Sequence, residues 1–79
     1  MGIEYKIRFE VRAREELELR LERILKNIAE VEKEVTVKLE DDGIYFCDNC
    51  GDPLISSRIF RRLVDAALSE SPEVVIREL

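Results

Sequence analysis

The residues with the clearest chemical potential are two cysteines separated by two residues, Cys47 and Cys50. Two thiols at this spacing can chelate one soft or borderline metal ion, close a small disulfide, or cycle between the dithiol and disulfide states. The chain of 79 residues has no other cysteine and no histidine. Imidazole metal sites are therefore excluded, and the commonest general acid–base side chain at neutral pH is missing. We expect a small binding module, not an enzyme.

The segment around the cysteines, residues 46–54 with the sequence FCDNCGDPL, resembles the first knuckle of a zinc ribbon. In that family a Cys-x-x-Cys-Gly turn directs two sulfurs and backbone amides at the metal. The resemblance implies zinc or a similar ion as cofactor, with Cys47 and Cys50 as its ligands. A structural zinc site has four ligands, and this chain has no second knuckle. We therefore expect a homodimer that shares the ion, or help from carboxylates such as Asp48 and Asp52.

A strand followed by Cys-x-x-Cys and a helix also resembles thioredoxin-like redox motifs. In those motifs the first cysteine sits at a helix N-terminus, where the helix dipole favours the thiolate. Here Cys50 lies nearer the expected helix start than Cys47 does, and no basic residue occurs between Lys38 and Arg58. Acidic surroundings oppose a thiolate and attract a cation, so the pattern favours a metal ion over dithiol redox chemistry. A dithiol redox protein is kept as an alternative.

The composition suggests a further alternative, an idealised or de novo designed scaffold without natural activity. Regular alternation of apolar and charged residues and an Asp-Gly hairpin fit known design rules. Charged residues make up 39% of the chain, and Asn27 and Asn49 are its only amide side chains. The same composition is typical of hyperthermophile proteins, so we expect a thermostable protein.

The elements that would position the cysteines follow from the apolar pattern. Five alternations from Ile3 to Val11 predict a strand with one buried face. From about Ala13 the apolar residues recur at three- and four-residue steps, which predicts a helix that ends near residues 31–33. Leu19 falls off the apolar stripe, whose members are Leu17, Leu21, Ile24, Leu25, Ile28 and Val31.

Alternation returns over residues 35–40 and again over 44–47, which predicts a hairpin. Asp42-Gly43 is typical of its turn, because both turn positions tolerate positive φ. With this turn Leu39 faces Phe46 and Glu40 faces Tyr45, so that Phe46 points into the core and Cys47 onto the open face.

A second helix and a final strand complete the pattern. Asp52 and Pro53 predict an N-cap followed by proline at the first helical position. The helix ends between Ser69 and Pro72, and a short strand follows at residues 74–76. The apolar stripe of the helix consists of Ile55, Ile59, Phe60, Leu63, Val64 and Ala67.

The resulting order β-α-β-β-α-β predicts an α+β fold in one domain, residues 1–79. The simplest solution is a ferredoxin-like two-layer sandwich, a four-stranded antiparallel sheet with two helices on one face. The net charge of −5 argues against nucleic acid as a partner, because phosphate binding needs a basic surface. No apolar run approaches the roughly 20 residues of a membrane helix, and the charged start is unlike a signal peptide. We therefore expect a cytoplasmic protein.

Overall fold

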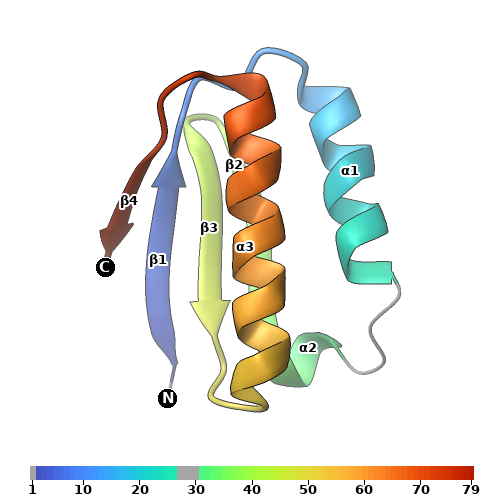
Figure 1. Cartoon of the computed structure of the whole chain (residues 1–79), viewed down its shortest axis with the longest axis vertical. Coiled ribbons are helices and arrows are strands. Elements are labelled where there is room, and N and C mark those ends of the chain that lie inside the picture. The colour runs from blue at the N-terminus through green and yellow to red at the C-terminus, as the bar shows by residue number, and fades with distance from the viewer. Residues whose placement is uncertain (1, 27–30) are drawn as a thin grey trace.

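The computed structural model describes residues 2–26 and 31–79 and confirms the ferredoxin-like α+β fold. Four strands form one antiparallel sheet in the order β2-β3-β1-β4, and two long helices cover one of its faces (Figure 1). The predicted helix over residues 13–33 corresponds to α1 up to Lys26 and to α2 from Val31, and residues 27–30, with Ile28 among them, lie outside the described residues. In chain order the elements are β1 (Ile3–Arg8), α1 (Arg14–Lys26), the one-turn α2 (Val31–Glu34), β2 (Val35–Glu40), β3 (Gly43–Asp48), α3 (Pro53–Glu70) and β4 (Val75–Glu78).

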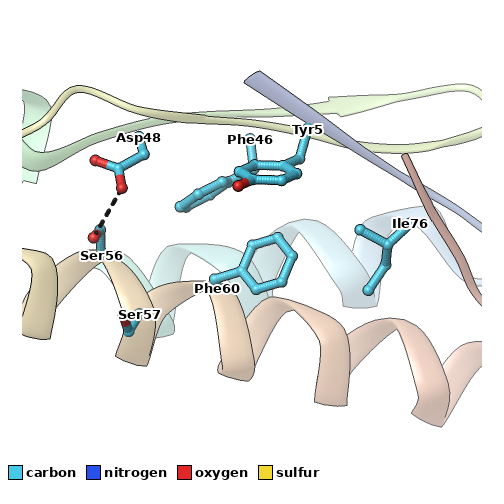
Figure 2. Close-up of a pocket in the computed structure, with 7 residues that line it drawn as sticks. All are labelled: Tyr5, Phe46, Asp48, Ser56, Ser57, Phe60 and Ile76. Atoms are coloured by element: carbon cyan, nitrogen blue, oxygen red, sulfur yellow. Dashed lines mark hydrogen bonds between the residues drawn. The ribbon is translucent and has the colours of Figure 1, made fainter. Parts of the chain in front are cut away.

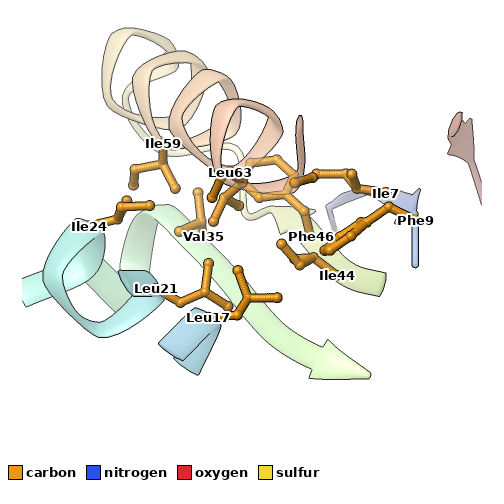
Figure 3. Close-up of a cluster of buried hydrophobic side chains, with 12 residues drawn as sticks. Ile7, Phe9, Leu17, Leu21, Ile24, Val35, Ile44, Phe46, Ile59 and Leu63 are labelled. Atoms are coloured by element: carbon orange, nitrogen blue, oxygen red, sulfur yellow. The ribbon is translucent and has the colours of Figure 1, made fainter. Parts of the chain in front are cut away.

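The core lies between the helices and the inner face of the sheet (Figure 3). Alternate strand residues point inward, and Ile7 and Ile44 lose all their exposure to solvent. Leu19 is 55% exposed, as its place off the helical stripe predicts. The buried apolar residues are Ile7, Phe9, Leu17, Leu21, Ile24, Val35, Ile44, Phe46, Ile59, Leu63, Ala66 and Ala67.

The pairing between β2 and β3 differs by two residues from the predicted register. Asp41 and Asp42 form the turn, and Leu39 lies opposite Ile44 instead of Phe46. The predicted Asp42-Gly43 turn is therefore wrong. Because the register differs by an even number of residues, every side chain keeps its predicted face.

The physical reason lies in the neighbouring strand β1. Gly43 has φ of +151° and belongs to β3, and a side chain at this position would collide with the backbone carbonyl of Ile7. The N–H of Phe9 donates a hydrogen bond to the Asp42 carbonyl at 3.1 Å. Gly43 is needed where two backbones approach closely, and the turn moves onto the residues before it.

The helical layer leaves the β4 side of the sheet uncovered (Figure 1). All four residues of β4 are exposed. Ile76 lies opposite Ile7 in the ladder and therefore points to the same inner face, yet it is 45% exposed whereas Ile7 is fully buried. Apolar surface on the inner face of β1 and β4 is consequently exposed beside α3.

Candidate functional site

The Cys-x-x-Cys segment forms the connection between β3 and α3. Cys47 is half-buried near the end of β3, and Cys50 is exposed in the loop with φ of +61°. Both thiols are free. Cys47 pairs with Glu4 and Thr36 in the ladders, so its side chain points to the open face of the sheet. Asp48 follows in the strand and points to the opposite, helical face.

Carboxylates around the cysteines hold the loop by accepting hydrogen bonds from its backbone. Asp48 Oδ1 accepts the Cys50 N–H at 2.8 Å, and Asp52 Oδ1 caps α3 by accepting the Leu54 N–H at 2.9 Å. Glu34 accepts the N–H of Asp52. Asp48 and Asp52, which were expected to help bind a cation, thus accept hydrogen bonds from backbone N–H groups.

The predicted metal-binding function is therefore wrong. Among residues 2–26 and 31–79, no three cysteine, aspartate or glutamate side chains form a group that could hold a metal ion. Cys47 and Cys50 do not form a metal-holding group with the nearby carboxylates: Asp48 points to the opposite face of the sheet from Cys47, and Asp52 caps α3. The described residues give no support to thermostability or to a designed origin, and the homodimer stays a prediction.

A groove lies between α3 and strands β1, β3 and β4. Its volume is about 340 Å³. Figure 2 shows Asp48 and Ser56 at one end, three aromatic rings in the middle, and Ile76 at the other end. We call it the aromatic groove; its lining residues are Tyr5, Phe46, Asp48, Ser56, Ser57, Phe60 and Ile76.

The three rings of the groove form one packed cluster. The ring centroids of Phe46 and Phe60 lie 5.1 Å apart, those of Tyr5 and Phe60 5.4 Å, and those of Tyr5 and Phe46 6.2 Å. All three pairs are tilted or edge-on, the geometry that the ring quadrupoles favour. Phe46 is buried, whereas Tyr5 and Phe60 are half-buried and present part of their rings to the groove.

The hydroxyl groups that line the groove differ in whether they already have hydrogen-bond partners. Ser56 is buried, and its hydroxyl lies 3.2 Å from Asp48 Oδ2 and 3.3 Å from the Pro53 carbonyl. The hydroxyl of Tyr5 has no hydrogen-bond partner among the described residues and points toward the Asp48 end of the groove (Figure 2). Ser57 is exposed and is the fifth residue of α3, and its hydroxyl likewise has no hydrogen-bond partner within this part of the chain.

The alternation and helical-stripe patterns place Tyr5, Phe46 and Phe60 in the core and do not indicate the groove. One signal was available. Asp48 lies two residues after Phe46 in the same strand, so its carboxylate shares the inner face with that buried ring. A carboxylate in an inward-facing strand position calls for a partner or a cavity, because buried charges are costly when unpaired.

The open face of the sheet carries ionic and hydrogen-bonding pairs between residues of different strands and of the β2–β3 turn. Tyr45 donates its hydroxyl hydrogen to Glu4, and this bond, with burial and Cys47 nearby, raises the Tyr45 pKa far above its usual value. Lys6 pairs with Glu40 and, at 2.6 Å, with Asp42. Burial acts to lower the pKa of Lys6, but hydrogen bonds to the two carboxylates outweigh it and the pKa rises. The hydrogen bond from Lys6 lowers the pKa of Asp42.

Comparison with family models, with curated proteins and with solved structures gave no match for this chain. None of the helices in the described residues has the length and apolar character required to cross a membrane. The expected cytoplasmic location and the expected lack of a nucleic-acid partner stay predictions.

Proposed function

We propose that this chain is a small-molecule-binding module whose ligand lies in the aromatic groove. The observation that carries the proposal is an open cavity of about 340 Å³ in which two half-buried rings, Tyr5 and Phe60, and the exposed Ile76 meet a carboxylate. Ligand sites in proteins are concave, mostly apolar, about 300–1,000 Å³ in volume, and carry a few polar groups that orient the ligand. The groove has each of these properties.

The groove is an incomplete part of the core. Ile7 and Ile76 are paired neighbours on the same face, but only Ile7 is covered by the helical layer. A ligand seated against Ile76 and the rings would remove apolar surface from water, which is favourable by about 25 cal/mol per Å². The Tyr5 hydroxyl adds a donor and an acceptor that folding has left unused.

Chemical-shift mapping with a fragment set tests the proposal. Monocyclic aromatic and branched aliphatic fragments with neutral, cationic and anionic head groups are added at about 1 mM to isotope-labelled protein, because a small ligand in an open groove binds weakly. We expect some fragments to shift resonances of Tyr5, Phe60 and Ile76. Phe60→Leu, which keeps an apolar side chain but removes the ring, is expected to weaken their binding about fivefold.

Leu68→Ala is the matched control, since Leu68 is on the same helix, 49% exposed, and outside the groove. Its binding of the same fragments should equal that of the unmodified chain. The proposal is overturned if no fragment shifts the groove resonances, or if Phe60→Leu binds as tightly as Leu68→Ala.

A further inference from the structure

We infer that the ligand of the aromatic groove is a small organic cation, an ammonium group attached to an aromatic body. This inference rests on the proposed function and names the chemical class of its ligand. Among the residues that the structure describes, Asp48 is the one charged residue that lines the groove. No ion pair joins Asp48 to a cation within residues 2–26 and 31–79. Its charge is therefore available to a ligand at the polar end of the cavity.

The Asp48 carboxylate is held in place yet keeps free acceptor capacity. Oδ1 accepts the Cys50 N–H at 2.8 Å, and Oδ2 lies 3.2 Å from the hydroxyl oxygen of Ser56. Each oxygen of an ionised carboxylate can accept two hydrogen bonds, so one position on each oxygen is open. An ammonium group, which has three donors and no acceptor, matches these positions and the Tyr5 hydroxyl oxygen that faces the same end (Figure 2).

An anionic ligand does not fit the same end of the groove. The start of a helix can bind anions through its free N–H groups, and α3 begins beside the groove. These donors are already used: the Leu54 N–H bonds to Asp52 Oδ1 at 2.9 Å, and the Ile55 and Ser56 N–H groups bond to the Asp52 carbonyl at 3.1 Å. Pro53 has no N–H to offer. In the described part of the chain, no lysine or arginine lines the groove either.

The aromatic cluster specifies the body of the ligand. A ligand ring placed against the exposed parts of Phe60 and Tyr5 can stack at an offset or edge-on, as the three native rings already do with one another. The ring faces also attract a cation, which adds to the attraction of the Asp48 carboxylate. The apolar Ile76, at the end of the groove away from Asp48, covers the side of the body that carries no charge (Figure 2).

Three probes of similar size and different charge test the ligand class: 2-phenylethylamine, 2-phenylethanol and 3-phenylpropionate. Binding is measured by chemical-shift titration at low ionic strength, where surface charges are least screened. We expect the amine to bind about tenfold more tightly than the alcohol, and the carboxylate to bind more weakly than both. Asp48→Asn should weaken amine binding about tenfold and change alcohol binding less than about twofold.

Ser57→Asp provides a second variant that does not disturb the Asp48 hydrogen bonds. Ser57 is exposed and is the fifth residue of α3, so its replacement disturbs no buried contact and the variant is expected to fold. The added carboxylate at the groove should tighten amine binding about threefold and weaken binding of 3-phenylpropionate. Ser57→Asn, with nearly the same shape and no charge, is the matched control and should change neither.

The outcomes separate the two proposals. If the alcohol binds as tightly as the amine, or if Asp48→Asn and Ser57→Asp leave amine binding unchanged, the inference of a cationic ligand is wrong. The proposal of a binding module is then unaffected. The same holds if none of the three probes binds while another fragment shifts the groove resonances. If no fragment of any charge binds in the groove, both proposals fall.

Discussion

Replacement of Asp48 by alanine is expected to destabilise the protein far more than replacement of both cysteines by serine. The comparison tests what holds the connection between β3 and α3. In the structure the connection depends on carboxylates that accept backbone N–H groups, and the thiols are free. If this description is right, Cys47 and Cys50 are replaceable in the ligand-free protein and Asp48 is not.

The magnitude follows from the two hydrogen bonds that Asp48→Ala removes. A hydrogen bond to a charged group contributes about 1.5–3 kcal/mol to stability. The Cys50 N–H is exposed and can turn to water, and Ser56 keeps the Pro53 carbonyl as a partner, so each loss falls below this range, at about 1 kcal/mol. We expect a total of about 2 kcal/mol, which corresponds to a fall in Tm of about 8–16 °C for a domain of this size. Asp48→Asn, which keeps one acceptor oxygen, should lose about half as much.

Urea unfolding followed by circular dichroism, under reducing conditions, measures both variants on one scale. The double variant Cys47→Ser and Cys50→Ser is expected to lose less than about 1 kcal/mol, because Cys50 is exposed and Cys47 half-buried. A larger loss in the double cysteine variant than in Asp48→Ala would refute the reasoning. So would an Asp48→Ala midpoint equal to that of the unmodified chain.

Two further substitutions test the hairpin and the open face. Gly43→Ala should lower the free energy of unfolding by about 3 kcal/mol or more, since φ of +151° and the Ile7 carbonyl leave no room for a side chain. Asp41→Ala in the adjacent turn is the control, and equal urea midpoints for the two variants would contradict the assigned turn. Lys6→Met should lower the Tm by about 4 °C near pH 7, because the ion pairs with Glu40 and Asp42 are lost. Because the pKa of Asp42 is lowered, its pairing stabilises the fold above its unfolded pKa, and this stabilisation is lost as the pH falls through the folded pKa. Because the pKa of Lys6 is raised, its stabilising contribution is complete below pH 10.5 and is lost as the pH rises through the folded pKa. The Tm difference should therefore shrink both in acid and above pH 10.5, and a difference that is constant with pH in thermal scans would count against the pairing.

The strand and helix pattern was predictable because it depends on local periodicity. Alternation placed Ile7 and Phe46 on the inner face, and the Asp52-Pro53 pair placed the start of α3 correctly. These signals act over a few residues, so no knowledge of the other elements is needed to interpret them.

The register of the hairpin and the burial of Ser56 were beyond local reasoning. Asp41, Asp42 and Gly43 all tolerate turn conformations, and the choice among them is made by the backbone of β1, which only the folded sheet brings against Gly43. Ser56 is 4% exposed although it lies outside the predicted apolar stripe. Its hydroxyl is satisfied by Asp48 at the end of β3, together with the Pro53 carbonyl in the first turn of α3, and buried polar groups are stable only when they have such partners.

The groove depends on where α3 lies across the sheet, and the sequence does not encode that placement in any short pattern. This placement gives one side chain two roles. Asp48 accepts a hydrogen bond from the cysteine loop and also supplies the charge of the groove. Loss of amine binding in an Asp48 variant therefore has two sources, a loosened loop and a missing charge. Ser57 separates them, because it lies at the groove and makes none of the Asp48 contacts. A gain of amine affinity from Ser57→Asp can come only from charge, whereas a loosened loop predicts no gain at all.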